Sequence, residues 1–240
     1  MSLSAIASTG ATIAILLCLG GLLGLANQKN FAPRWLGLSA LLLLINDLML
    51  TRVWGLLPDL AGSSDWNWMG KIMALIATLA IAAHPAIGWS KAGLTLRQNP
   101  QGRTLTYGVM LLTVILFGWL ALSQPNEPVD MDTLAFQLTM PGLEEETFYR
   151  GLLLLALNEA FRGRWQIAGI GLGWGGVIST FLFGLTHALG YSEGAFSFDI
   201  MSFAMTGVPA LILLWVRERT GSVVWPIILH NFANSASHLI

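Results

Sequence analysis

The chain has 240 residues, of which 55% are hydrophobic and 10% are charged. Soluble domains carry about 25% charged residues, so this composition indicates a membrane protein. The formal net charge of −1 excludes a broad basic surface for nucleic acid, and the single cysteine, Cys18, excludes a disulfide within the chain.

Apolar segments long enough to span a bilayer, which requires about 20 residues, follow one another along the whole chain. They are expected near residues 4–26, 35–57, 69–90, 104–123, 143–161, 166–189, 200–216 and 222–239. The first lacks the charged start of a secretory signal, so it is expected to be a retained span. The joints between segments are too short for a soluble domain. The sequence therefore predicts an all-α membrane protein, a polytopic bundle of about eight transmembrane helices forming one integral membrane domain over residues 1–240.

The joints alternate in charge along the chain. The basic joints carry Lys29, Arg34, Lys91, Arg97, Arg103, Arg162, Arg164, Arg217 and Arg219. The remaining joints carry Asp59, Asp65, Glu127, Asp130, Asp132, Glu193 and Asp199. Because cytoplasmic loops are enriched in lysine and arginine, the basic joints are expected on the cytoplasmic side and both termini outside.

The segment MPGLEEETFYRGLLL, residues 140–154, carries three consecutive glutamates and an arginine at the start of an apolar run. Glu146 and Arg150 are four residues apart with the acid first, the favourable order for an ion pair along a helix. The three glutamates, residues 144–146, are expected in the first turn after Pro141, where the helix dipole favours negative charge. These features do not account for three adjacent carboxylates, so the cluster is a candidate functional site.

Two later segments contain polar side chains one helical turn apart. FLFGLTH places Phe183 and His187 at the end of the sixth segment, and HNFAN places His230 and Asn234 on one face of the eighth. Counting from the joints places Glu145 and His187 near the outer end of the bundle and His230 at about mid-depth. The sequence therefore predicts that the three motifs meet in a polar intramembrane cavity in the outer half of the membrane.

A carboxylate, two imidazoles and a carboxamide are suited to hydrolysis. The carboxylate can act as a general base on water, and a histidine can orient that water. A second histidine with an asparagine can donate hydrogen bonds to the oxyanion of a tetrahedral intermediate. A glutamate with two histidines can also form a zinc set, although the HExxH spacing of soluble zincins is absent.

The motifs EETFYR, FGLTH and HNFAN resemble those of the CAAX-processing and bacteriocin-processing (CPBP or Abi) family of intramembrane proteases, which includes the type II CAAX prenyl endopeptidase, also called the Ras-converting enzyme. The resemblance covers residues 140–240, which carry all three motifs. It implies that Glu145 activates water with His187 as its partner, and that His230 and Asn234 form the oxyanion site. The supporting residues that it implies are Glu146, Arg150 and Phe183.

The resemblance leaves the cofactor and the substrate open. Metal-free glutamate chemistry is favoured; zinc, if bound, would be held by Glu145, His187 and His230. The expected partners are membrane lipid and a peptide or lipidated protein substrate, in a prokaryotic plasma membrane. Eukaryotic relatives cut prenylated CAAX tails on the cytoplasmic face, so a site near the outer face argues against a strict prenyl-protein substrate.

Two other functions fit a bundle with buried charges. The first is a non-proteolytic immunity or regulatory protein that uses the same scaffold for binding. The second is a transporter with a proton relay, which is disfavoured because the sequence shows no inverted repeat and bunches its acids at one end.

Overall fold

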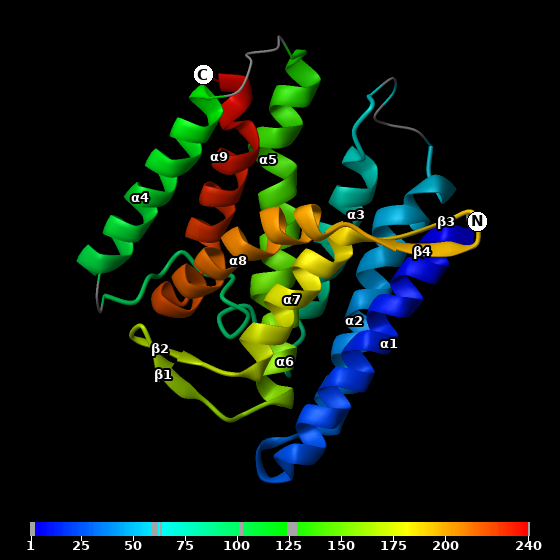
Figure 1. Cartoon of the computed structure of the whole chain (residues 1–240), viewed down its shortest axis with the longest axis vertical. Coiled ribbons are helices and arrows are strands. Elements are labelled where there is room, and N and C mark those ends of the chain that lie inside the picture. Colours follow the sequence, from blue (N-terminus) through cyan, green and yellow to red (C-terminus); the bar gives the residue numbers. More distant parts are fainter. Residues whose placement is uncertain (1–2, 59–61, 63, 101–102, 124–128, 240) are drawn as a thin grey trace.

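The computed structural model describes residues 3–58, 62, 64–100, 103–123 and 129–239, and these are mostly helical (Figure 1). The described helices are α1 (Leu3–Ala26), α2 (Pro33–Thr51), α3 (Trp68–Ala82), α4 (Arg103–Leu122), α5 (Met131–Glu146), α6 (Leu154–Ala160), α7 (Trp174–Ala188), α8 (Ile200–Thr220) and α9 (Val224–Leu239). The short helices are η1 (Gln28–Asn30), η2 (Val53–Leu56) and the π-helical segment η3 (Thr147–Leu153). Two antiparallel hairpins pair β1 (Trp165–Ile167) with β2 (Ile170–Leu172), and β3 (Leu189–Ser192) with β4 (Ala195–Phe198).

Four described helical stretches are long and apolar enough to cross a membrane: Ile6–Ala26, Pro33–Thr51, Arg103–Leu122 and Ile200–Thr220. Helix α3 is apolar but has only 15 residues. These helices expose large apolar side chains, such as Leu22, Leu112 and Trp119, as surfaces that face lipid do. The expectation of a helical membrane protein is confirmed in this coarse form, whereas eight spanning helices are not.

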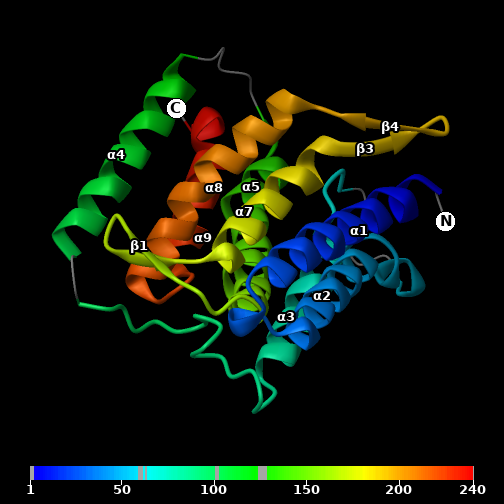
Figure 2. The same ribbon diagram turned by 60° about the horizontal axis from the view of Figure 1, so that its bottom comes forward.

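The helices form three groups, which Figure 2 shows from one end. Helices α1, α2 and α3 lie on one side, α4, α8 and α9 lie on the other, and α5 and α7 lie between them. Helix α5 packs against α9 and α3, while α7 packs against α8 and α1. An apolar core that includes Leu42, Phe148, Leu157 and Leu182 joins α2, η3, α6 and α7. The central helices therefore contact both outer sets of helices, and side chains that are far apart in the sequence can meet on them.

Segments α5, η3 and α6 follow one another without a break over residues 131–160. Helix α5 begins after Asp130, whose side chain accepts a hydrogen bond from the Thr133 amide, and Pro141 lies inside it. The expected helix start after Pro141 is therefore wrong. The three glutamates lie at mid-length, about 20 Å from either end, so the dipole of a first turn does not account for them. For the same reason Glu145 does not lie near the outer end of its helix.

The Asn231 side chain of α9 bonds to the backbone of α5 on both sides of Pro141. The Gly142 amide donates to Asn231 Oδ1 at 2.7 Å, and Asn231 Nδ2 donates to the Thr139 carbonyl at 3.0 Å. A side chain at residue 142 would collide with Asn231 and with the Ile227 carbonyl, so glycine allows this close approach. These contacts tie the backbone of α5 to α9, and such bonds are favourable for backbone groups that lie away from water.

The π-helical segment η3 widens the rod directly after the glutamates. Ser179 Oγ of α7 donates to the Tyr149 carbonyl at 2.8 Å, and Arg217 Nε of α8 donates to the Arg150 carbonyl at 3.0 Å. Wide turns of this kind disturb the regular ladder of backbone bonds and occur often at functional sites. Here side chains from two neighbouring helices bond the displaced carbonyls.

Several expected boundaries are corrected by the structure. Residues 166–172 form a hairpin rather than the start of a span, because Ala168 and Gly169 have φ of 50° and 77° and make a tight turn of the kind that joins paired strands. Glu193 and Gly194, with φ of 51° and 83°, make the equivalent turn between β3 and β4. Helix α3 ends at Ala82 rather than near residue 90, and α8 continues past its internal proline to Thr220.

The basic joints meet at one end of the structure, the lower end in Figure 1. The Arg162 amide donates to the Asn30 carbonyl at 2.9 Å, and the Asn99 amide donates to the Thr220 carbonyl at 2.8 Å. Arg219 donates to the Gly169 carbonyl at 2.5 Å. Helix α1 ends and helix α9 begins at this basic end, so the two terminal helices extend away from it. Of the acidic joint residues, Asp59 and Glu127 lie outside the described residues.

Candidate active site

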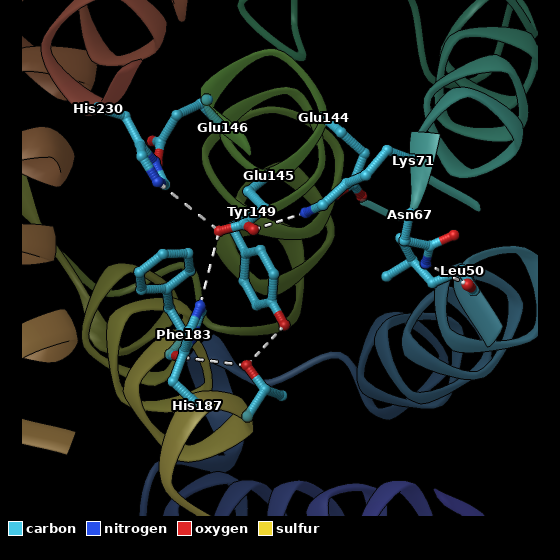
Figure 3. A network of polar contacts seen from close by, with 12 residues as sticks. Leu50, Asn67, Lys71, Glu144, Glu145, Glu146, Tyr149, Phe183, His187 and His230 are labelled. Carbon is cyan, nitrogen blue, oxygen red and sulfur yellow. Dashed lines mark hydrogen bonds and ion pairs between the residues drawn. The ribbon is translucent and has the colours of Figure 1, made fainter. Parts of the chain in front are cut away.

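Glu145 lies between two histidines that come from different helices (Figure 3). Its Oε2 atom is 3.8 Å from Nε2 of His187 on α7 and 3.8 Å from Nε2 of His230 on α9. The side chain of Glu145 is 15% exposed and that of His230 is 10% exposed. The structure therefore brings the acid and both histidines singled out in the sequence into one place.

Hydrogen bonds on the far side of each imidazole determine which nitrogen faces Glu145. His187 Nδ1 lies 2.7 Å from the Phe183 carbonyl, which can only accept, so Nδ1 carries a proton. His230 Nδ1 lies 2.7 Å from Oε1 of Glu146 and donates to that carboxylate in the same way. Both histidines therefore present Nε2 to the acid.

Glu146, Arg150 and Phe183 form a buried support behind the site. Arg150 Nη1 lies 3.1 Å from Oε1 of Glu146, and these side chains are 1% and 0% exposed. The Arg150 guanidinium lies 4.2 Å from the centre of the Phe183 ring, a favourable cation–π arrangement. The same ring packs 4.6 Å from the His187 ring and 5.9 Å from the His230 ring, centre to centre. Displacing any of these groups would move a histidine.

Lys71 and Asn46 also belong to the polar network, although no motif in the sequence includes either residue. Lys71 Nζ of α3 lies 2.8 Å from Oε2 of Glu144 and 2.5 Å from Oε1 of Glu145 (Figure 3). Asn46 Nδ2 of α2 donates to Oε1 of Glu144 at 2.8 Å. Glu144 is 1% exposed and has no capping contact at a helix start. A lysine near the start of an apolar segment was the available signal, because such a charge needs a partner.

Two cavities meet at Glu145 and His187. The first, of about 290 Å³, is the more polar of the two, and its lining includes Thr9, Thr12, Asn46, Asp47, Lys71 and Thr186. The second, of about 250 Å³, has a mainly apolar lining that includes Phe117, Met205, Pro209, Leu213 and Leu229. His230 and Asn234 also line the second cavity. Asn234 therefore lies in the wall of the same cavity as Glu145, His187 and His230. The acid is thus accessible from a polar side and an apolar side.

The zinc set named from the sequence, Glu145, His187 and His230, has its donor atoms together here, with Oε2 3.8 Å from each Nε2. Zinc holds its ligands at about 2.0–2.2 Å in tetrahedral geometry. Among the described histidine, cysteine, aspartate and glutamate side chains, no group of three or more is placed to hold a metal. Lys71 also occupies Oε1 of Glu145, leaving one oxygen of that carboxylate toward the histidines.

A carboxylate that faces two imidazole Nε2 atoms, beside a carboxamide and an apolar cavity, has the groups of a hydrolytic site inside a helical membrane protein. Residues 128–236 match the family model described as Rce1-like, type II CAAX prenyl endopeptidase. The match spans all three motifs and confirms the resemblance seen in the sequence, so the part of the chain that carries the site is Rce1-like. It indicates a protease of the CAAX type. No curated protein and no solved structure matches the chain.

Proposed function

We propose that the protein is an intramembrane endopeptidase that hydrolyses a peptide bond in a membrane-associated protein or peptide, with water activated by Glu145. The position of Glu145 Oε2 carries this proposal. That atom is buried without a hydrogen-bond partner among the described residues and lies 3.8 Å from both Nε2 atoms. A water molecule at the usual distance of about 2.8 Å from Oε2 and from one Nε2 atom is compatible with this separation.

In the proposed reaction Glu145 Oε2 takes a proton from the water while the water oxygen bonds to the carbonyl carbon of the substrate. His187 orients this water through the lone pair on Nε2. The electron pair of the carbonyl π bond moves to its oxygen. Asn234 donates to that oxyanion through its carboxamide, and His230 donates through Nε2 in its protonated form. When the intermediate collapses, the C–N bond breaks and the proton on Glu145 passes to the leaving nitrogen.

The two cavities support an amphiphilic substrate. The apolar cavity would take an apolar side chain or a lipid group, and the peptide backbone would cross to Glu145. The polar cavity is lined by Ser8 near the start of α1, Leu50 near the end of α2 and Lys71 near the start of α3, the helix ends away from the basic joints. We propose a multi-pass protein of a prokaryotic plasma membrane, with the basic joints in the cytoplasm and the polar cavity facing the outside.

The test is peptide cleavage by the purified protein in lipid nanodiscs, with prenylated and unprenylated membrane-anchored peptides. We expect cleavage that a chelator does not inhibit and that Glu145→Gln or His187→Ala reduces by about 10²–10⁴-fold. Ser237→Ala, on α9 beyond the singled-out residues, is the matched control and should keep the wild-type rate. Unchanged cleavage by folded Glu145→Gln protein would refute the mechanism, whereas loss of activity with the chelator would indicate a metal-dependent peptidase.

An immunity or regulatory role without proteolysis predicts a different result. In that case the biological activity would survive in the Glu145→Gln variant, and no peptide would be cleaved under any condition. The comparison of this variant with wild type therefore separates the two functions.

A further inference from the structure

Two side chains of the polar network come from outside the Rce1-like segment. Asn46 lies on α2 and Lys71 lies on α3, whereas the family match covers residues 128–236. Both contact glutamates at the centre of the site. The proposed reaction assigns them no step, and no motif includes them.

The start of α3, which carries Lys71, is held against the end of α2. Asn67 caps α3 by accepting a hydrogen bond from the Gly70 amide at 3.0 Å, and its Nδ2 donates to the Leu50 carbonyl at 2.8 Å (Figure 3). A side chain at Gly70 would collide with that carbonyl and with Asn67. Lys71 follows directly, so the backbone from which its side chain extends has a fixed place beside the glutamates.

The contact with Lys71 gives the two oxygens of Glu145 different neighbours. The ammonium holds Oε1 at 2.5 Å, and Oε2 is the oxygen that faces His187 and His230. The two oxygens are chemically equivalent, so the ion pair does not choose between them; it restrains the plane of the carboxylate, with one oxygen on Lys71 and the other toward the histidines. This restraint favours catalysis by Glu145, because a general base must lie within hydrogen-bonding distance of the water from which it takes a proton.

Glu144 and Asn46 in turn hold Lys71. An ammonium has three donors, and Lys71 directs two contacts to Glu144 and Glu145. Glu144 accepts from Asn46 on its other oxygen, so its carboxylate is held between α2 and α3. The contacts form a chain from Asn46 through Glu144 and Lys71 to the proposed base.

The charges around Glu145 give Lys71 a particular importance. The titratable or charged groups that line the two cavities at Glu145 or pair directly behind them are Lys71 on α3, Asp47 on α2, Glu144 and Glu146 on α5, Tyr149 and Arg150 on η3, His187 on α7 and His230 on α9. The cation of Arg150 pairs with Glu146. Among the described residues, Lys71 is the lysine or arginine paired with Glu145, and it also serves Glu144.

We propose that Lys71 is a positioning residue of the hydrolytic site, held by Glu144 and Asn46, which keeps the Glu145 carboxylate turned with one oxygen toward the two histidines. The inference rests on the proposed function of Glu145 as the base. It assigns Glu144 a role in orienting Lys71 rather than in touching substrate.

The kinetic test measures the pH–rate profile of peptide cleavage for Lys71→Met, Lys71→Arg and the double variant Lys71→Met with Glu144→Gln. For Lys71→Met we expect kcat to fall by about 10²-fold, since a base loses its orientation, with KM nearly unchanged. The acid side of the profile should move to higher pH, because the carboxylate has lost its cation. Lys71→Arg should recover part of kcat. The control is Lys29→Met, an exposed lysine at the basic end, which should match wild type.

The double variant distinguishes positioning from packing. It removes one buried positive and one buried negative charge, so the midpoint of thermal unfolding should return toward wild type while kcat stays low. Recovery of kcat together with stability, or an unshifted profile in Lys71→Met, would overturn the proposal.

An infrared measurement provides a readout that needs no substrate. Subtracting the spectrum of Glu145→Gln from that of wild type isolates the bands of Glu145, and repeating this in the Lys71→Met background gives the pH at which its carboxylate signal is lost. We expect that pH to be higher without Lys71, and equal values would refute the inference. If the pH is higher in the Lys71→Met background but the wild-type protein cleaves no peptide, the proposed function is refuted while the role of Lys71 is supported.

Discussion

His230 donates from Nδ1 to Oε1 of Glu146 at 2.7 Å, and this contact turns its Nε2 atom toward Glu145. The receiving oxygen also accepts from Arg150 at 3.1 Å, so the acid that orients the imidazole is itself paired with a cation. An acid that holds a histidine in one tautomer and one orientation is a recurring device in hydrolytic enzymes. Adjacent glutamates thus have separate tasks: Glu145 faces the cavities and Glu146 lies behind a histidine.

Replacing Glu146 by glutamine should impair the proposed reaction while leaving the shape of the side chain intact. The amide cannot stabilise a protonated His230 as a carboxylate does, so we expect kcat to fall by about 10²–10⁴-fold with a smaller change in KM. Steady-state cleavage of a membrane-anchored peptide measures both constants. Glu159→Gln removes an exposed carboxylate at the end of the same rod and is the control. Equal kcat for Glu146→Gln and wild type would contradict this role for Glu146.

The Arg150→Met variant should be strongly destabilised. It leaves the carboxylate of Glu146, which is 0% exposed, without its cation, and unpaired buried charges of this kind cost about 3–5 kcal/mol. Unfolding in detergent micelles measures the free energy. In Arg162→Met the lost partner is Glu159 at 3.5 Å, with side chains 55% and 43% exposed, so the loss should stay below about 1 kcal/mol. Similar losses in the two variants would show that the buried pair adds little.

Asp199 should make the start of α8 sensitive to acid. Hydrogen bonds from Ser202 and from the Met201 amide lower the pKa of this exposed aspartate below its ordinary value of 3.8. A lowered pKa in the folded state contributes stability above the ordinary pKa, and this stability is lost as the pH falls through the lowered value.

Amide hydrogen exchange at Met201 and Ser202 measures this effect, after correction for the intrinsic pH dependence of exchange. Protection should decrease in strong acid for wild type and remain constant for Asp199→Asn, because asparagine also caps helices and does not titrate there. The same loss of protection in both proteins would mean that another group controls this helix end.

Reporter fusions should report the same side of the membrane for both termini, opposite to the basic joints. The reason is that basic joints collect at one end of the structure while α1 and α9 extend away from it. Alkaline phosphatase, which is active outside, and green fluorescent protein, which fluoresces inside, can be fused to each terminus and within the joint at residues 91–103. Fluorescence from a terminal fusion would reverse the proposed orientation without changing the site.

The sequence was sufficient to locate Glu145, His187 and His230, because each belongs to a motif with helical spacing. It was not sufficient to find Lys71, although the buried Glu144 required a cation and Lys71 interrupts an apolar segment. Ion pairing between separate helices leaves no spacing pattern in a single sequence, so only the three-dimensional packing of α3 against α5 identifies that partner.

The helix boundaries failed for local reasons. Pro141 favours a helix start, but α5 continues through it, and Asn231 bonds to the backbone on both sides of the proline. Residues 165–172 are apolar enough for a span, and the turn at Ala168 and Gly169 lacks the asparagine or aspartate that usually marks such hairpins. Apolar content alone does not distinguish this hairpin from the start of a helix.

The bridge from Asn231 to the backbone on both sides of Pro141 also sets how far α9 can slide along α5. A shift by a single residue would break both hydrogen bonds at once, at about 0.5–1.5 kcal/mol each. His230 is the neighbouring residue on α9, so its height relative to the acid is locked by main-chain bonding. Axial registration of the two helices is therefore maintained even when the reacting groups change their charge.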